Sequence, residues 1–365
     1  MIEERIDDFD HLIYLRVFEG CNLHCEHCFI PSNPKKMTID QIKEIRGYVQ
    51  SFAKPGDKII FQWHGGEPTA IGLRFMTEAM SIVDELKDTY RITHGIQTNL
   101  TKYNEGWRDL FMKYVGKEVG ISWDPDIRYL KKNDPSSNAE FETIFWRNVS
   151  KMIEDGFEPL LIVTGTKKLF TKFKNPFLML EYFREKGIRK IHIERITKTG
   201  NAVDNWNSLG LTHKEYSTAM SRLLKAYVSF QNRNLPLEEN LFVSPLDGYI
   251  ESVASMETEK PKGYGCNSGK CDTAFHTIDA DGYKAGCTAL TTNEQATSDN
   301  GAVQFVTFTG LRRKREERQM TCIGCPYKSV CSSGCMTSEK FDGSGECFGG
   351  KMIFEQAQNL LNRIV

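Results

Sequence analysis

The spacing of the cysteines constrains this chain of 365 residues more than any other feature of its sequence. Three of the eleven form the run C-N-L-H-C-E-H-C near the N-terminus, as Cys21, Cys25 and Cys28. The other eight lie towards the C-terminus: Cys266, Cys271, Cys287, Cys322, Cys325, Cys331, Cys335 and Cys347. Three thiolates can hold three irons of a cubane cluster and leave the fourth iron open, whereas eight thiolates fill two closed clusters. The sequence therefore predicts a redox enzyme with one open and two closed iron–sulfur clusters.

The alternative for both groups is zinc. His24 or His27 would complete a zinc site with the first group, and the second group would form two zinc knuckles. Zinc prefers four closed ligands, and zinc ribbons usually pair one C-x₂-C with another, which the second group does not do. Disulfides are disfavoured because no apolar stretch follows Met1, so we expect no signal peptide and a cytoplasmic location, where thiols stay reduced.

The overall charge argues against nucleic-acid and membrane partners. The formal net charge is −1, and no apolar run approaches the length needed to span a bilayer. One basic cluster occupies residues 312–318, R-R-K-R-E-E-R. Its interleaved glutamates favour a solvated helical face; contact with a nucleic acid or a leader peptide is the alternative.

The first two hundred residues alternate between strand-like and helix-like segments. Strands are predicted at residues 12–18, 58–63, 90–97, 118–123, 158–165 and 189–196. Thr38 and Gln41 form a capping box that starts a helix, and Gly156 and Gly187 fall where helices should end. Six successive βα units predict an α/β fold in which a parallel sheet curls into a partial (β/α)₆ TIM-like barrel.

The composition divides the chain into four regions. We expect the barrel at residues 1–205, a helical bridging region at 206–262 and a C-terminal helix at 351–365. Residues 263–350 are rich in Gly, Cys, Ser and Thr, with few long helical patterns. Such a segment cannot build a core from side chains alone, so we expect the clusters to stabilise it. Asp281-Gly282 is typical of a hairpin turn, which would bring Cys271 and Cys287 together.

Polar motifs follow the predicted strands where ligands bind in parallel sheets. W-H-G-G-E-P-T at residues 63–69 follows the second strand, Q-T-N at 97–99 the third, and S-W-D at 122–124 the fourth. The two glycines of the first motif let the backbone approach a ligand closely. Backbone carbonyls at the edge of the sheet, together with Glu67, can accept hydrogen bonds from an ammonium group of that ligand. Each motif alone could be a turn. Together, around an open iron, they predict a pocket for a zwitterionic nucleoside.

The C-x₃-C-x₂-C run followed by G-G-E-P resembles the radical S-adenosylmethionine (SAM) superfamily. The resemblance implies that Cys21, Cys25 and Cys28 hold a [4Fe–4S] cluster whose open iron chelates the amine and carboxylate of SAM. Gly65, Gly66 and Glu67 match the motif that binds the amine, and Asn99 and Ser122 lie where carboxylate and ribose contacts are expected. One-electron reduction would then yield a 5′-deoxyadenosyl radical.

The C-terminal cysteines resemble the SPASM extension of radical peptide and protein maturases. By that resemblance one auxiliary cluster is held by Cys266, Cys271, Cys287 and Cys335, and a second by Cys322, Cys325, Cys331 and Cys347, three [4Fe–4S] clusters in all. Eight ligands can be grouped in many other ways. Closed clusters have no iron open to substrate, so we expect them to carry electrons from an oxidised substrate. No cysteine is left over, which disfavours an epimerase that returns hydrogen from a thiol.

The substrate is less constrained than the cofactors. Sulfatase maturases resemble this chain in architecture, but their aspartate base follows the cysteine that corresponds to Cys287, where this chain has Thr288. The W-H-G-G-E-P form resembles maturases of ribosomal peptides, so we predict oxidation, and most simply crosslinking, of a peptide or protein side chain. Alternatives are a sulfatase-type maturase, a dehydrogenase of a small alcohol, and a non-catalytic zinc protein. The base, the bond formed and the oligomeric state stay open.

The expected partners are a peptide or protein substrate and a one-electron reductant of the flavodoxin or ferredoxin type. The first strand begins so early that we expect no N-terminal leader-binding module, and any leader would be recognised by a separate protein or by the rim of the barrel. The candidate pocket residues are His64, Trp123, Asp124, Arg128, His192, Glu194 and Arg195. Core packing or ion pairing is the alternative role for each.

Overall fold

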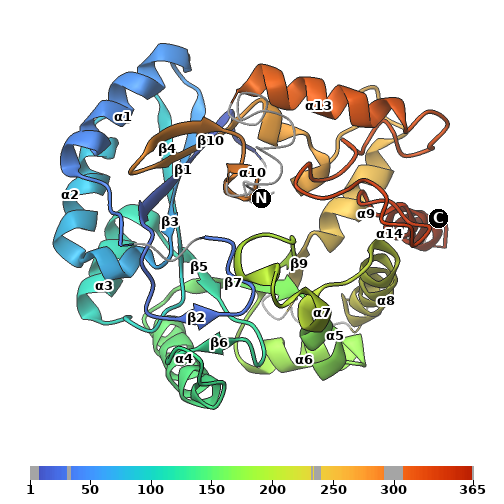
Figure 1. The fold of residues 1–365 in the computed structure, drawn as a ribbon, viewed down its shortest axis with the longest axis horizontal. Coiled ribbons are helices and arrows are strands. Elements are labelled where there is room, and N and C mark those ends of the chain that lie inside the picture. The colour runs from blue at the N-terminus through green and yellow to red at the C-terminus, as the bar shows by residue number, and fades with distance from the viewer. Residues whose placement is uncertain (1–7, 31–33, 232, 234–239, 292–306, 364–365) are drawn as a thin grey trace.

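Six parallel strands form the centre of the fold, as the sequence predicts (Figure 1). The computed structural model describes residues 8–30, 34–231, 233, 240–291 and 307–363. The strands lie side by side in the order β1 (His11–Phe18), β3 (Lys58–Gly65), β4 (Arg91–Thr98), β5 (Glu118–Ser122), β7 (Glu158–Gly165) and β8 (Lys190–Arg195). The sheet is not closed, so the predicted partial barrel is confirmed.

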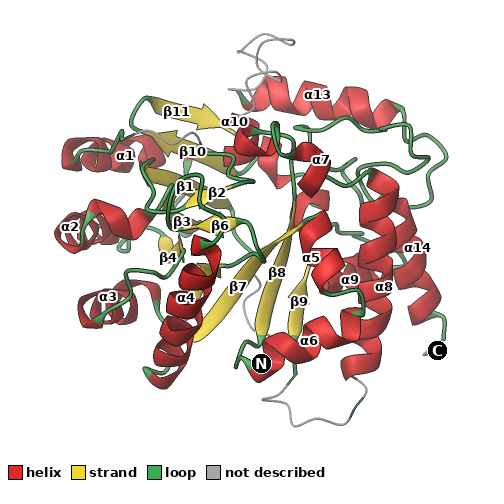
Figure 2. Ribbon diagram, turned by 60° about the horizontal axis from the view of Figure 1, so that its bottom comes forward, coloured by secondary structure: helices red, strands yellow, loops and turns green. Residues whose placement is uncertain are grey.

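Helices cover the outer face of this sheet (Figures 1 and 2). They are α1 (Ile39–Phe52), α2 (Leu73–Asp84), α3 (Glu105–Leu110), α4 (Ser137–Glu154), α5 (Lys167–Lys172) and α6 (Pro176–Glu185). The capping box of Thr38 and Gln41 is present at the start of α1. Gly156 and Gly187 follow α4 and α6 with φ of 90° and 79°, a left-handed conformation that ends helices at low cost for glycine.

The alternation along β3 shows which side chains enter the barrel. Phe61 and Trp63 are fully buried against the helices, and the Trp63 indole donates to His94, whose ring contacts Asp84 of α2. Successive side chains of a strand point to opposite faces. His64, the next residue, therefore faces the lumen of the barrel.

Two additions widen the sheet beyond the six predicted strands. At one edge β10 (Phe275–Asp279) pairs in parallel with β1, and β11 (Gly282–Ala285) returns antiparallel to it. The predicted hairpin is present, but its turn is Ala280-Asp281, one residue earlier than predicted, because Gly282 already pairs with Asp279 as the first residue of β11. At the other edge β9 (Phe242–Ser244) pairs in parallel with β8. The C-terminal cysteine region is thus hydrogen-bonded directly to the first strand of the barrel.

The remaining helices lie beside the open edge of the barrel. Helices α8 (His213–Gln231), α9 (Leu246–Ser255) and α14 (Lys351–Leu361) pack together, and the rings of Tyr249 and Phe354 meet at 4.7 Å. The predicted ends of two helices, Asn232 and Val365, lie outside the described residues. Other elements are β2 (His24–Cys25), β6 (Arg128–Tyr129), α7 (Trp206–Leu209), α10 (Thr288–Thr291), α13 (Phe308–Met320), η1 (Pro68–Ile71), η2 (Phe111–Val115), η3 (Gly200–Ala202), η5 (Gly265–Asn267) and η6 (Lys270–Asp272).

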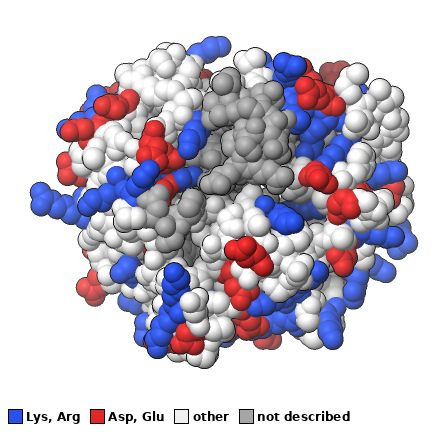
Figure 3. Space-filling view, viewed as in Figure 1, with Lys and Arg blue, Asp and Glu red and all other residues white. Residues whose placement is uncertain are grey.

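Positive and negative side chains alternate over the face that Figure 3 shows, without a large field of one sign. Within the described part of the chain, no helix is both long enough and apolar enough to cross a membrane.

Candidate functional site

The three N-terminal thiols lie on a loop at the carboxyl end of β1. The short strand β2 pairs with β6, so that Cys25 stands opposite Arg128, and the carbonyl of Cys28 accepts from the backbone of Asn201 at 2.9 Å. Burial raises the pKa of Cys21 and of Cys25 to about 12. The charges of the neighbouring thiolates in this group add to that rise. Three desolvated sulfurs are thus gathered in one loop.

The G-G-E motif packs directly against this loop. Gly66 donates to the carbonyl of Phe18 at 2.8 Å, and Glu67 donates to the carbonyl of Gly20 at 3.0 Å. A Cβ atom on Gly65 would lie 2.1 Å from the carbonyl oxygen of Phe18, and one on Gly66 would lie 2.5 Å from that of Gly20. Only glycine fits at either position. A hollow of about 390 Å³ opens beside the contact, lined by Phe18, Gly20, Cys21, Asn22, Pro34, Ala70 and Lys102.

The buried carboxylate of Glu67 joins the ends of β3 and β4. It accepts from the backbone and hydroxyl of Thr69 at 3.0 and 2.6 Å, from the hydroxyl of Thr98 at 2.7 Å, and from the backbone of Asn99 at 2.7 Å. Burial raises the pKa of Glu67, although these donors oppose the rise. With both oxygens engaged, Glu67 is a clamp between loops, and the carbonyl of Gly65 is contacted by His64 at 2.9 Å.

Asn99 and Ser122 lie at neighbouring strand ends. The Asn99 amide donates to Asn22 at 3.0 Å and lies 3.8 Å from the sulfur of Cys21. The hydroxyl of Ser122 accepts from Gln97 at 2.9 Å. Gln97 belongs to the predicted Q-T-N motif, whereas Asn22 had no distinguishing signal in the sequence, because its role comes from a contact between different loops.

Asp124 and Arg128 form a buried ion pair beneath the cysteine loop. Arg128 donates to Asp124 at 2.9 and 2.6 Å, and its guanidinium lies 3.9 Å from the sulfur of Cys25. Burial would raise the pKa of Asp124, but Arg128 and His27 outweigh it and hold that pKa below its usual value. The pair positions the loop. Trp123 is fully buried against rings of α4 and α6, so its place is in the core and not in the lumen.

His64, His192 and Glu194 face the lumen. The His64 ring lies 4.9 Å from that of Tyr14 on the neighbouring strand, and burial lowers the pKa of His64 to about 4. His192 contacts Glu194 at 3.0 Å and Ser244 of β9 at 3.1 Å. Tyr14 and Ser244 were not singled out from the sequence, since neither lies in a motif.

One group of C-terminal thiols surrounds the β10–β11 hairpin. Cys271 and Cys287 pack against one small apolar cluster, which includes Met336 beside Cys335. Burial is the main cause of the raised pKa of Cys287, and the charges of Cys335 and Cys271 raise that pKa further. Burial does the same for Cys266, and the charges of Cys335, Cys287 and Cys271 again add to it.

Residues 312, 313, 316 and 317 are exposed on α13, as predicted for a solvated helical face, but Arg315 is an exception. Its side chain is buried, pairs with Asp272 at 2.8 Å and reaches the sulfur of Cys271 at 2.6 Å. The charge pattern of the sequence could not show which side of α13 meets a thiol.

The other C-terminal thiols lie near Gly349. A Cβ atom on Gly349 would lie 2.8 Å from the sulfur of Cys331 and 3.8 Å from that of Cys347. Burial raises the pKa of Cys331, and after it the charges of Cys347, Cys322 and Cys325 contribute. Lys340 donates to the sulfur of Cys322 at 2.8 Å.

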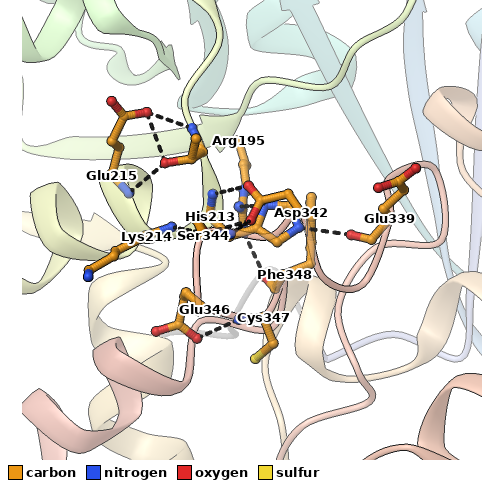
Figure 4. A network of polar contacts seen from close by, with 11 residues as sticks. Arg195, His213, Lys214, Glu215, Glu339, Asp342, Ser344, Glu346, Cys347 and Phe348 are labelled. Carbon is orange, nitrogen blue, oxygen red and sulfur yellow. Dashed lines mark hydrogen bonds and ion pairs between the residues drawn. The ribbon is translucent and has the colours of Figure 1, made fainter.

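The loop that carries Cys347 is held to the barrel by Arg195 (Figure 4). The guanidinium lies 3.8 Å from the centre of the Phe348 ring, donates to the Phe348 carbonyl at 2.6 Å and donates to His213 at 2.9 Å. The backbone of His213 donates to Asp342 in the same loop. Arg195 therefore connects the end of β8 to the C-terminal cysteine region and is not a lumen residue.

The donor sets suit iron–sulfur clusters. Every proposed ligand in both regions is a thiol, ten of them half-buried and Cys266 exposed. Eight carry a raised pKa because desolvation disfavours the thiolate, so bound iron would compensate that charge. Among the residues that the structure describes, no three Cys, His, Asp or Glu side chains converge on one point as ligands of a single ion would. Thiolates of a cubane bind separate irons and stand further apart.

Comparisons with known proteins agree with this geometry. Residues 15–138 match the model of the Radical SAM superfamily. A serine-type anaerobic sulfatase-maturating enzyme of Klebsiella pneumoniae is 30% identical over 364 residues, 94% of this chain and 86% of that enzyme. Two shorter matches, to an uncharacterised Synechocystis protein and a Klebsiella aerogenes serine-type enzyme, span 34% and 29% of those proteins.

Two solved structures share the fold. The structure of anSMEcpe with bound AdoMet and Cp18Cys peptide has a TM-score of 0.69 at 19% identity, over 97% of this chain and 99% of that one. Streptococcus suis SuiB bound to S-adenosylmethionine has a TM-score of 0.57 at 15% identity, over 90% and 73%.

The barrel and its cysteine loop define a radical SAM enzyme, and this class implies a [4Fe–4S] cluster and SAM. The chain belongs to the family of radical SAM maturases that includes the anaerobic sulfatase-maturating enzymes.

Proposed function

We propose that the chain uses a 5′-deoxyadenosyl radical to oxidise a side chain of a peptide or protein. The observation that carries the proposal is the packing of the Gly65–Glu67 segment onto the loop of Cys21, Cys25 and Cys28 at the carboxyl end of the barrel. These thiols would hold the cluster that leaves one iron open for SAM. When bound and reduced, SAM supplies the radical that removes a hydrogen atom from substrate.

The residues around that loop have distinct roles in the proposal. The carbonyls of Gly65 and Gly66 would accept from the methionyl amine, while Asn99 and Ser122 would contact the carboxylate and the ribose. Glu67 and the Asp124–Arg128 pair hold the three loops at a fixed distance from one another. The barrel excludes water from the radical.

The C-terminal thiols would form two closed clusters, with Cys266, Cys271, Cys287 and Cys335 on one and Cys322, Cys325, Cys331 and Cys347 on the other. The packing around Met336 and around Gly349 supports this grouping. Closed clusters would accept the electron that an oxidised substrate releases. The enzyme would need a one-electron reductant of the flavodoxin or ferredoxin type, and a separate protein would present any leader peptide.

Two candidate products follow from the proposal. The sequence favours a crosslink between side chains, and this stays a prediction. The full-length similarity to a serine-type sulfatase-maturating enzyme favours a second candidate, the oxidation of one serine or cysteine side chain. For a serine, both reactions remove two hydrogen atoms, so mass alone does not separate them. A cysteine that ends as a carbonyl would also exchange its sulfur for the oxygen of water, with release of sulfide, and would differ in mass from a crosslink. A carbonyl product reacts with a hydrazide, whereas a crosslink changes the fragmentation of the peptide.

Anaerobic reconstitution tests the proposal. Three cubanes predict about twelve irons per chain, and the reduced enzyme should convert SAM to 5′-deoxyadenosine. It should also remove two hydrogens from a peptide in a panel carrying Ser, Cys, Trp or Tyr. Cys28→Ala should abolish 5′-deoxyadenosine and leave about eight irons. Stoichiometric zinc without 5′-deoxyadenosine would refute the enzyme, and turnover of small alcohols alone would refute the peptide.

A further inference from the structure

Glu194 is an unusual residue for the inner face of a barrel. It lies next to last in β8, its side chain is 53% exposed to the lumen, and one oxygen contacts the imidazole of His192 at 3.0 Å. His192 is held on its other side by Ser244, which stands opposite it in β9. Two strands therefore fix the imidazole, and the imidazole fixes the carboxylate.

The charge of Glu194 acts on Tyr14 of β1 and on the C-terminal thiol of Cys266. Burial is the main cause of the raised pKa of Tyr14, but the charges of Cys287, Glu194 and Cys28 all contribute to it. The charge of Glu194 also acts on Cys266, second only to burial. The pKa of Tyr14 thus depends on thiols of both cysteine regions, and the charge of Glu194 acts on Tyr14 and on the C-terminal set.

The buried acids near the lumen, unlike Glu194, are already engaged. Glu67 accepts four hydrogen bonds, Asp124 pairs with Arg128, and Asp279 accepts from the backbone of Asp281 and pairs with Arg16. Glu346 accepts three backbone N–H groups. The second oxygen of Glu194 has no partner among the residues that the structure describes. Thr288, which follows Cys287, carries a hydroxyl and is no base at neutral pH.

We propose that Glu194 is the base that takes the proton released when the substrate side chain is oxidised, with His192 as its positioning residue. The inference rests on the proposed function. The radical first takes one hydrogen atom from a substrate C–H bond and becomes 5′-deoxyadenosine. The substrate radical would then give the proton of its neighbouring O–H, S–H or N–H group to Glu194 and one electron to the closed cluster that the thiols around Cys266 would hold, and a new bond would form at the carbon.

The test compares Glu194→Gln with the wild type, using a peptide that the wild type oxidises, deuterated at the reacting carbon. Glutamine keeps the length and can still accept from His192, but it cannot take up a proton. Deuterium should still pass to 5′-deoxyadenosine within about twofold of the wild-type rate, while product falls about 10²-fold, the lower range for loss of a general base. Glu194→Asp should recover part of the product. Glu158→Gln, at the opposite end of the barrel, is the matched control.

Each outcome decides the matter. Equal product per 5′-deoxyadenosine in Glu194→Gln and wild type would overturn the role of Glu194 alone. If Glu194→Gln lost deuterium transfer and product to the same extent at unchanged iron content, Glu194 would have a structural role, and its role as a base would also be overturned. If the wild type oxidises no peptide of the panel, the proposed function fails and the inference falls with it.

Discussion

At the scale of single residues, Gly66 controls the approach of the Gly65–Glu67 segment to the cysteine loop. A methyl group there would lie 2.5 and 2.6 Å from the backbone oxygens of Gly20 and Glu19, and backbone cannot rotate away as a flexible side chain can. Gly66→Ala should therefore separate the two loops. We expect 5′-deoxyadenosine formation to fall by at least about tenfold, since small displacements of reacting groups are costly. Gly47→Ala in α1, where an added methyl meets nothing within 4 Å, is the control.

Glu67 gives a second prediction at this scale. The carboxylate of Glu67 now accepts from groups of Thr69, Thr98 and Asn99. In glutamine one of the two oxygens becomes an NH₂ group, so some of these buried donors would lose their acceptor, which destabilises the folded chain. Glu67→Gln should lower the free energy of unfolding by about 2 kcal/mol. Urea unfolding followed by tryptophan fluorescence measures this change. Glu78→Gln, on the exposed face of α2, should change it by less than about 0.5 kcal/mol; equal effects of both variants would contradict the clamp.

At the scale of elements, the features of the fold that could be predicted from the sequence are those that depend on short local patterns. The six barrel strands carry continuous or alternating apolar residues, and the capping box and the Asp281-Gly282 pair at the hairpin are local signals. The strand β9 was missed because only three residues, Phe242–Ser244, pair with β8. The attachment of β10 to β1 was also missed, because a register between strands 260 residues apart depends on packing and not on local pattern. Arg315 was misjudged for the same reason.

The contact between β10 and α1 predicts a pH dependence. His276 shares a hydrogen bond of 2.6 Å with the hydroxyl of Tyr48, and its ring stacks on that of Phe52 with 4.3 Å between the ring centres. Burial, together with the charge of His11, lowers the pKa of His276 to about 3. An unfolded histidine titrates near pH 6.5, so below that pH the unfolded chain binds a proton that the folded chain excludes. This contribution to stability is complete above about pH 6.5 and is lost as pH falls towards 3.

The variant His276→Gln isolates this effect, because glutamine does not titrate. Between pH 6.5 and 5.5 the wild type should lose about 1 kcal/mol more of its unfolding free energy than the variant does. Urea midpoints at the two pH values measure the difference, and contributions of the other groups cancel between the two proteins. A steeper loss in the variant would show that His276 is charged in the folded chain.

At the scale of the whole molecule, the cysteine regions are joined to the barrel at both of its edges. The hairpin β10–β11 extends the sheet beside β1, and Arg195 at the end of β8 holds the loop of Cys347 (Figure 4). The lumen with Tyr14 and Glu194 lies between these attachments. A single rigid assembly would thus keep the radical source and the electron acceptors on opposite sides of one substrate, which suits a reaction that releases a proton and an electron after losing a hydrogen atom.

The grouping of the eight C-terminal thiols is testable through pairs of substitutions, because a cluster that has lost one ligand is little affected by losing a second. Cys271→Ala with Cys287→Ala should remove about four irons per chain, no more than either change alone, since both would belong to one cluster. Cys287→Ala with Cys347→Ala should remove about eight. Iron analysis gives these numbers, and 5′-deoxyadenosine formation, which in the proposed function depends on Cys21, Cys25 and Cys28, reports that each variant is folded. If the first pair removed about eight irons, the hairpin thiols would serve different clusters. The electron would then leave the substrate through a centre built across both regions, and the division at Met336 and Gly349 would reflect packing alone.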